Sequence, residues 1–279
     1  MLVLNVVAVV VLYRPDQETI KFWRTYVEKG EKLIAIVNLT DDSDLLAIQK
    51  SKFTKLIVNI GNLGLAVALN QGLQSAKEAD AAYVLLLDQD SKPPVGMGQM
   101  LADELKVLQR NGQKFAAIGP TLLDRKGGGL ELAQLREGQI RELTTIATSG
   151  TIIDMAALQI IGNMQEDLFI DGIDHEWCHR ARSKGYRVGA STSVTMPHDM
   201  GDDGIVLFGR YRPLHRSPFR HYYIARNTLR LAQLKYIPRK WRAKEVLKLL
   251  YRVPVYILNS NDRIATVKSL FRAFHDWRI

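Results

Sequence analysis

The chain has little of what marks several common classes of protein. Of its 279 residues only Cys178 is a cysteine, which excludes an intrachain disulfide framework and a cysteine-rich zinc site and fits a reducing compartment. No apolar run reaches the about 20 residues that are needed to cross a bilayer. The apolar opening, residues 1–13, has no basic leader and no small-residue cleavage site, so we expect a first buried strand there.

Composition and charge then bound the class of protein that is present. Hydrophobic residues make up 47% and charged residues 24%, as in a soluble globular protein of one or two domains. The net charge of +9 is uneven, because residues 211–279 hold 16 Lys or Arg against three acids, whereas residues 1–210 hold 22 basic against 26 acidic side chains. This pattern argues against a nucleic-acid binder along the whole chain and indicates a separate role for the basic C-terminal quarter.

Strand-like and helix-like segments alternate through the body of the chain. The sequence predicts strands over residues 3–12, 33–37, 55–60 and 83–88, with helices over residues 15–29 and 62–76. Strands and helices that alternate with short connections predict an α/β fold with a mostly parallel central sheet and right-handed crossovers.

Two carboxylates directly follow the fourth of these strands. The apolar run 83–87 suits a strand buried on both faces, and it ends in Asp88, Gln89 and Asp90 before two prolines stop it. The carboxyl edge of such a strand is where α/β sheets bind ligands. Side chains two apart on an extended segment point the same way, so Asp88 and Asp90 can converge on one hard cation. The alternative is a solvated acidic turn.

A segment rich in glycine and asparagine connects the third strand to the next helix. Residues 59–70 read Asn-Ile-Gly-Asn-Leu-Gly-Leu-Ala-Val-Ala-Leu-Asn, which is neither a dinucleotide fingerprint nor a P-loop. Glycine lets a backbone approach a ligand, and the free N–H groups of a helix N-terminus suit a phosphate or sugar oxygen. The alternative is a helix that is capped by Asn62, with glycines for tight packing.

Residues 166–182 are rich in acidic side chains. From Asp174 the spacing predicts an amphipathic helix. Its inward face is formed by Trp177, Cys178 and Ala181, and its more exposed face by Glu176, Arg180 and Arg182. Asp174 at the helix start can act as a base or as an N-cap. His175 and His179 lie four apart but lack the glutamate of a His-Glu-x-x-His motif, so we do not expect a zinc pair.

Taken in order, these segments resemble those of a known family. The segments are Tyr13-Arg14-Pro15, residues 59–70, Asp88-Gln89-Asp90, Thr148-Ser149-Gly150, residues 169–177, His198 with Gly201, and residues 217–227. Their order and spacing resemble the GT-A inverting glycosyltransferases of family 2, especially the bacterial rhamnosyltransferase branch, over most of residues 3–230. The resemblance implies a Rossmann-like GT-A domain with a mostly parallel sheet over residues 1–205 and a basic helical region over residues 206–279.

The resemblance also implies roles for individual positions. It implies a nucleotide-sugar site at Tyr13, Asn38, Asn62, Gly64, Asn70, Asp88 and Gln89. It implies that Asp90 and His198 hold Mg²⁺ or Mn²⁺ against the donor diphosphate and that Asp174 is the catalytic base. The acceptor side would comprise Ser149, Gly150, Asp171, Glu176 and Trp177.

Two positions depart from the family pattern. Ile173 stands where glutamate is common, which leaves the base aspartate in place. Val37, just before Asn38, stands where relatives often have an aspartate that helps to read the nucleotide base. Base recognition would then depend on other residues, with Asp41 and Asp42 as candidates.

The implied activity is inverting, metal-dependent transfer of a sugar. By resemblance alone the donor is dTDP-rhamnose, and the acceptor is a lipid-linked glycan in bacterial surface polysaccharide synthesis of the O-antigen or capsule type. A sugar nucleotidyltransferase would share the sheet and the acidic pair but usually needs a glycine-rich basic loop near the first strand. A non-catalytic relative that binds a nucleotide-sugar also stays open, and donor turnover separates it from an enzyme.

The C-terminal quarter combines basic residues with apolar and aromatic ones. The apolar positions are Trp241, Val246, Leu249, Leu250, Tyr251, Tyr256, Phe271, Phe274 and Trp277. Such a basic amphipathic surface predicts a cytoplasmic protein that docks peripherally on the anionic inner face of the cell membrane, with no nucleic-acid partner. The alternative is that these stripes pack on the body or on a second subunit, as in a homo-oligomer.

Overall fold

The computed structural model describes residues 4–39, 42–124, 139–198, 205–207, 210–212 and 216–278. These residues form an eight-stranded sheet in the order β3-β2-β1-β4-β7-β5-β8-β6 and a separate antiparallel pair, β9 (Ile205–Leu207) and β10 (Arg210–Arg212). The strands of the large sheet are β1 (Val6–Leu12), β2 (Leu33–Val37), β3 (Lys55–Val58), β4 (Tyr83–Asp88), β5 (Phe115–Asp124), β6 (Ile140–Leu143), β7 (Thr151–Asp154) and β8 (Arg187–His198).

The sheet is mostly parallel, as the sequence predicts. Strand β1 pairs in parallel with β2 and β4, β2 with β3, and β5 with β8. Strand β7 runs antiparallel between β4 and β5, and β6 runs antiparallel to β8. Val11 lies opposite Asp88, and Leu12 lies opposite Val37, so β1, β2 and β4 end at the same edge of the sheet. The acidic turn therefore lies at the carboxyl edge of a central strand.

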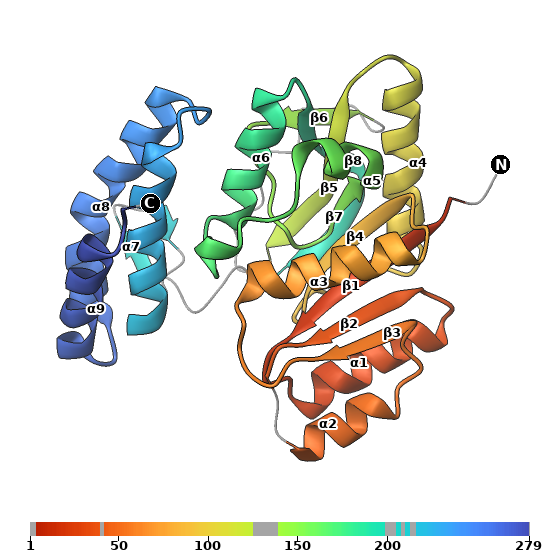
Figure 1. The fold of residues 1–279 in the computed structure, drawn as a ribbon, viewed down its shortest axis with the longest axis horizontal. Helices are drawn as coiled ribbons and strands as arrows, with labels where there is room; N and C mark the ends of the chain where they lie inside the picture. The colour runs from red at the N-terminus through yellow and green to blue at the C-terminus, as the bar shows by residue number, and fades with distance from the viewer. Residues whose placement is uncertain are drawn as a thin grey trace.

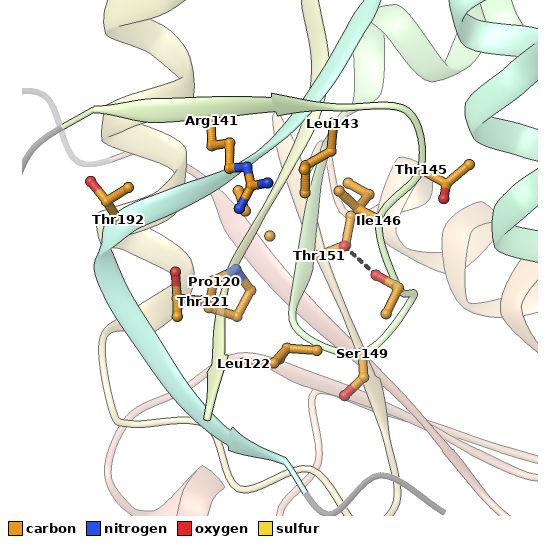
Figure 2. A pocket seen from close by; sticks show the side chains of 13 residues that line it. Pro120, Thr121, Leu122, Arg141, Leu143, Thr145, Ile146, Ser149, Thr151 and Thr192 are labelled. Carbon is orange, nitrogen blue, oxygen red and sulfur yellow. Dashed lines mark hydrogen bonds between the residues drawn. The ribbon is translucent and has the colours of Figure 1, made fainter. Parts of the chain in front are cut away.

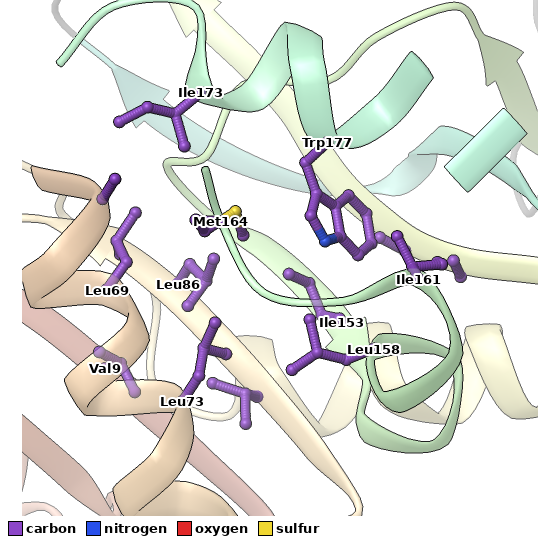
Figure 3. Close-up of a cluster of buried hydrophobic side chains, with 14 of the residues drawn as sticks. Val9, Leu69, Leu73, Leu86, Ile153, Leu158, Ile161, Met164, Ile173 and Trp177 are labelled. Carbon is purple, nitrogen blue, oxygen red and sulfur yellow. The ribbon is translucent and has the colours of Figure 1, made fainter. Parts of the chain in front are cut away.

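Helices cover both faces of the sheet (Figure 1). Alternate side chains of β1 enter one core with α3, α5 and α6 and a second core with α1 and α4. In the first core, Ile173 and Trp177 of α6 belong to the same cluster as Leu69 and Leu73 of α3, and Met164 lies between the two helices (Figure 3). These helices are α1 (Gln17–Glu28), α2 (Asp42–Gln49), α3 (Leu65–Glu78), α4 (Met97–Arg110), α5 (Met155–Ile161), the 3₁₀ helix η1 (Glu166–Leu168) and α6 (Ile173–Ser183).

Three further helices lie beside the sheet domain (Figure 1): α7 (Pro218–Gln233), α8 (Arg239–Asn259) and α9 (Arg263–His275). They have a small core of their own around Leu249 and Leu270. Leu231 and Ile237 instead belong to the core of the sheet domain, so α7 is built onto that domain. The predicted C-terminal helical region is thus present, and its division from the body at residue 205 stays a prediction. In the part of the chain that the structure describes, no helix is both long and apolar enough to cross a bilayer.

Candidate active site

A pocket of about 820 Å³ opens at the edge where β1, β2 and β4 end. Of the predicted site residues, Tyr13, Asn38, Asn62, Asp88, Gln89, Asp90, Ser149, Asp171 and Asp174 line it. The others that the structure describes do not line it, and these are Gly64, Asn70, Gly150, Glu176 and Trp177. The structure therefore brings together segments that are more than 100 residues apart in the sequence.

The turn after β4 presents its two carboxylates to this pocket. Ser91 closes the turn, because its N–H donates to the carbonyl of Asp88 at 3.0 Å and its Oγ accepts the N–H of Asp88 at 3.0 Å. The pKa of Asp88 is raised to about 7, chiefly by burial and then by the charges of Asp90 and Asp174, while the charge of Arg220 opposes this rise. Three carboxylates thus face a common space with too little positive charge, which argues against a merely solvated turn.

Gln89 fixes the acidic turn to the end of β1. Its Oε1 accepts the backbone N–H of Tyr13 at 2.7 Å, and its own carbonyl accepts the indole N–H of the buried Trp23 at 3.0 Å. The Gln89 side chain therefore shapes the pocket, while the Tyr13 ring is left 41% exposed at its wall.

Asn38 is fully hydrogen-bonded within the protein. Its Nδ2 donates to Oδ1 of Asn62 at 3.0 Å and to the carbonyl of Gly64 at 3.2 Å. Its Oδ1 accepts the side chain of Asn59 and the N–H of Leu63, each at 3.1 Å. An aspartate could not make the two donated bonds. The Asn38 amide therefore holds residues 59–64 in place. Val37, the position that departs from the family pattern, is the buried last residue of β2.

The start of α3 is not free for a ligand, contrary to our expectation. The helix begins at Leu65 with Gly64 as N-cap, so it is not capped by Asn62. The N–H groups of Leu65 and Ala66 both donate to the carbonyl of Phe169, at 2.6 and 3.3 Å. We expected these N–H groups to bind a phosphate or sugar oxygen. They instead bind the loop before α6.

Gly64 and Asn70 complete the contact between α3 and that loop. Gly64 has a φ of 90°, and a Cβ there would lie 2.6 Å from the Phe169 ring, so only glycine allows this approach. Asn70 donates to the carbonyl of Met164 at 3.0 Å and to Glu166 at 2.9 Å, and it accepts the N–H of Met164 at 2.9 Å. Both residues thus hold residues 164–169 and do not face the pocket.

Asp174 lies in the first turn of α6, where its carboxylate lines the pocket. Helix α6 begins at Ile173, and its N-cap is Gly172, which has a φ of 85° and offers no side chain. Asp174 accepts the N–H of the adjacent His175 at 2.8 Å. Asp174 is therefore not the N-cap of this helix, and its role as a base stays a prediction.

Glu176 and Trp177 face away from the pocket, and the expectation that Glu176 is exposed is wrong. Glu176 is 0% exposed, since it pairs with Arg180 at 2.7 Å and accepts the hydroxyl of Tyr236 at 2.5 Å. Trp177 is buried and donates to the carbonyl of Gly162 at 3.0 Å. The segment between α7 and α8 covers this side of α6, which the periodicity of α6 alone does not reveal.

The two histidines of α6 pack against a tryptophan of α8. The ring centroids of His175 and His179 lie 5.6 and 4.7 Å from that of Trp241. Burial lowers the pKa of His179 to about 4, with smaller contributions from His175 and Arg182. His179 is therefore a neutral, buried part of the contact between the sheet domain and the C-terminal helices.

Ser149 and Gly150 form one wall of the pocket. Ser149 Oγ shares a 2.6 Å hydrogen bond with Ser91 Oγ, which ties this wall to the acidic turn. Gly150 has a φ of 79°, and a Cβ there would lie 2.9 Å from both Met196 and Pro120. Gly150 therefore serves the close packing of the wall.

A second cavity of about 190 Å³ lies on the other side of this wall (Figure 2). It shares Ala147 and Ser149 with the larger pocket. Threonine and aliphatic side chains surround it, and the Arg141 side chain points into it. The two cavities together form a polar space and an adjoining, more apolar one.

Sequence reasoning missed the contribution of α7 to the site. Arg220 holds the carboxylate of Asp171 with two hydrogen bonds of 2.8 and 2.6 Å, and it lines the pocket with Ser217 and Phe219. The segment 217–227 did stand out in the sequence. A basic residue in a basic region, however, does not indicate which carboxylate 49 residues away it will meet.

Within the described ranges, no group of three or more His, Cys, Asp or Glu side chains is arranged to hold a metal ion. Asp90 is exposed at the pocket. The predicted second ligand, His198, ends β8, but its side chain lies outside the described residues, as do Gly201, Asp41 and the side chain of Asp42.

Solved structures identify the fold. The chain is similar to TarS of S. aureus, with a TM-score of 0.56 and 14% identity, over 89% of this chain and 43% of that one. A structure of TarS 1-349 gives a TM-score of 0.58 and 13% identity, over 98% and 80% of the two chains. GalNAc-T7 with UDP, GalNAc and Mn²⁺ gives 0.53 and 13%, over 94% and 59%. The chain spans less than half of the full TarS chain, and it has the GT-A glycosyltransferase fold that the sequence predicts.

A curated relative narrows the class of glycosyltransferase that the chain resembles. The chain is 28% identical to the dTDP-rhamnosyl transferase RfbF of Shigella flexneri over 281 aligned residues, which cover 95% of this chain and 92% of the relative. No protein-family model matches the chain. The predicted resemblance to family 2 glycosyltransferases and their rhamnosyltransferase branch is confirmed, since the chain is similar to a dTDP-rhamnosyl transferase along nearly its whole length.

Proposed function

We propose that the protein is an inverting, metal-dependent glycosyltransferase that moves L-rhamnose from dTDP-rhamnose to a glycan acceptor. The observation that carries the proposal is the meeting of Asp88, Asp90 and Asp174 in one pocket at the carboxyl edge of the sheet. The choice of donor follows the relative named as a dTDP-rhamnosyl transferase, which matches 95% of the chain.

The nucleotide would lie on the β1 and β4 side of the pocket. The exposed ring of Tyr13 offers an aromatic face to the base, and the Asp88 carboxyl offers hydrogen bonds to the ribose. Asn38 and Gln89 would contribute indirectly, because their side-chain amides already hydrogen-bond to protein groups around the pocket. Asn62, Gly64 and Asn70 support that same wall and the loop beside it.

Asp90 would hold Mg²⁺ or Mn²⁺ against the donor diphosphate, with His198 as the proposed second ligand. The residues present fit a cation, because three carboxylates raise one another's negative potential and Asp90 has an exposed side. Mg²⁺ is commonly bound through one or two carboxylates and substrate phosphates, without a complete protein cage. When bound, the cation supplies neutralisation of the charge that develops on the departing diphosphate.

Asp174 would act as the general base. Its carboxylate accepts the proton of the acceptor hydroxyl while that oxygen bonds to the anomeric carbon from the face opposite the diphosphate. The bond from the anomeric carbon to the diphosphate oxygen breaks in the same step, and its electron pair leaves with dTDP. A single displacement inverts the anomeric centre. Arg220, fixed by Asp171, places a positive charge beside the carboxylates.

The acceptor would approach from the Ser149 side of the pocket. Ser149 and Asp171 line the pocket there, and the cavity behind Ser149 extends it past the acidic turn. Gly150, Glu176 and Trp177 shape this side through packing and do not touch the acceptor. We propose a lipid-linked glycan of bacterial surface polysaccharide synthesis as the acceptor.

The outer face of α8 and α9 would dock the enzyme on the anionic cytoplasmic face of the membrane. Leu250 is 75% exposed and Phe271 is 77% exposed, and Leu247, Leu258 and Ile264 are exposed on the same two helices. Sixteen Lys or Arg between residues 211 and 279 give this region a positive charge that complements anionic lipid. Co-sedimentation with anionic vesicles that weakens as salt rises tests this placement, whereas salt-independent self-association would point to a second subunit.

The activity is tested with a panel of nucleotide-sugars, with and without Mn²⁺. We expect the wild-type chain to release dTDP from dTDP-rhamnose when metal and a lipid-linked glycan fraction are present. Release of pyrophosphate would instead identify a nucleotidyltransferase. Binding of dTDP-rhamnose without any release of nucleotide would identify a non-catalytic relative.

A further inference from the structure

The turn that leads into α6 has an unfavourable backbone. Phe169 has a φ of 63° and Asp171 a φ of 65°, both in the left-handed region that residues with a side chain rarely adopt. Gly172 follows with a φ of 85°. Such conformations are unfavourable and persist only where surrounding contacts impose them. Something outside the turn must therefore hold it.

Asn227 of α7 holds one side of this turn through hydrogen bonds. Its Nδ2 lies 2.8, 2.7 and 2.8 Å from the carbonyls of Leu168, Ile170 and Asp171, so its two N–H groups are shared among three acceptors of the turn. Asn227 itself is 1% exposed, so its amide is shielded from water and depends on these partners. The Nε of Arg226 donates to Oδ1 of Asn227 at 3.0 Å, which turns the Nδ2 end toward the loop.

The opposite side of the turn rests on α3. The carbonyl of Phe169 accepts the first N–H groups of that helix, from Leu65 and Ala66. The ring of Phe169 lies against Gly64 and stacks on Tyr223 of α7 with centroids 4.8 Å apart. The turn is thus clamped between a helix of the sheet domain and a helix of the C-terminal region.

We propose that Asn227 is a positioning residue for the base Asp174. The clamped turn runs directly into the first residue of α6, Ile173, and Asp174 is the next residue. Loss of the three hydrogen bonds frees the turn to relax from its left-handed conformations, which moves the start of α6 and the carboxylate on it. The expected effect of Asn227 on the rate of sugar transfer rests on the proposed function. The expected effect of Asn227 on the conformation of residues 168–172 does not depend on that function.

The experiment compares Asn227→Asp and Asn227→Ala with the matched control Asn259→Ala. Asn227→Asp keeps the size of the side chain but removes both donors. The side chain of Asn259 bonds to the carbonyl of Val255 within α8 and touches no site residue. Three quantities are measured on each folded full-length protein: hydrogen exchange of the Leu65 and Ala66 amides, affinity for dTDP with Mn²⁺, and the rate of dTDP release from dTDP-rhamnose.

We expect both Asn227 variants to exchange the Leu65 and Ala66 amides at least about tenfold faster than wild type, with dTDP affinity within about threefold. The rate of dTDP release should fall at least about tenfold, and Asn259→Ala should match wild type in all three. Unchanged exchange, or faster exchange with an unchanged rate of release, overturns the inference. If wild type releases no nucleotide from any donor, the proposed function fails, and exchange alone then decides whether Asn227 holds the turn.

Discussion

The sheet domain and the C-terminal helices differ in where they place their polar and their apolar side chains. In the sheet domain the strands are buried apolar runs, and the charged groups of the site gather at one edge. In the C-terminal region, α7 buries Arg226 and Asn227 against the sheet domain, whereas α8 and α9 expose large apolar side chains to the outside.

This difference assigns two tasks to the C-terminal region. Buried polar groups with several partners fix a geometry, since leaving any partner unsatisfied is costly. A contiguous apolar face on a folded domain marks a docking surface. We therefore propose that one side of the region orders the site and that the other side meets the membrane.

The largest effect that sharpens this comparison is expected at the edge of the sheet. Asp90→Ala should remove the dependence of dTDP binding on Mn²⁺, because the carboxylate that faces the diphosphate is lost. Asp88→Ala should only weaken binding. Calorimetry with Mn²⁺ and with EDTA measures both, and Asp103→Ala on α4 is the control. A metal dependence in Asp90→Ala equal to that of wild type rules out the proposed ligand.

A second effect is expected on the outer face of the C-terminal helices. The double change Leu250→Glu and Phe271→Glu should lower binding to anionic vesicles at least about tenfold, because it removes apolar contacts and adds negative charge. The changes Ile60→Glu and Ile160→Glu, at exposed apolar positions of the sheet domain, are the matched control. Equal losses in the two double variants would contradict a dedicated docking face. Truncation before α7 is a poorer test, since it also removes Asn227.

A third, smaller effect tests whether the side chain of Asn38 stabilises the fold. Asn38→Asp should lower the free energy of unfolding by about 2–3 kcal/mol, because the side chain is 2% exposed and a carboxylate would face two acceptors. Urea unfolding measures this, with Asn163→Asp at an exposed site as control. An Asn38→Asp variant as stable as wild type would contradict this structural role.

The smallest effect concerns acid stability at the contact between the two regions. The folded pKa of His179 is about 4, below the ordinary value of 6.5 for histidine, so the unfolded chain binds the proton more tightly. Stability should therefore fall as pH drops from about 6.5 to about 4. The His179→Gln variant has a neutral side chain at every pH in this range. Its free energy of unfolding should therefore fall by about 2 kcal/mol less than that of wild type between these pH values. Parallel curves of unfolding free energy against pH would show that His179 does not titrate this way.

The sequence predicted those features that depend on nearby residues. The buried strands β2 and β4 follow from uninterrupted apolar runs, and the acidic turn follows from the residues that end β4. The start of α6 next to Asp174 follows from helical spacing. Each of these signals lies within about a dozen residues, which is the range over which periodicity carries information.

The features that the sequence did not predict depend on contacts between distant segments. Residues 59–70 suggested a ligand site, yet their N–H and amide groups are used by the loop before α6, about 100 residues later. Glu176 has the position of an exposed residue on its helix, yet Tyr236 covers it. Glycine and asparagine have the same local signature whether they approach a ligand or another part of the backbone, so only the fold separates the two.

The central claim is that Asp174 is the base of a sugar transfer, and Asp174→Asn tests it most directly. This change keeps the shape of the side chain and removes its ability to accept a proton at neutral pH. The affinity for dTDP with Mn²⁺ and the rate of dTDP release from dTDP-rhamnose are measured on the same preparation. We predict nearly unchanged affinity and a rate lower by roughly 10²-fold or more. A rate equal to that of wild type, or equal losses of affinity and rate, would contradict the claim.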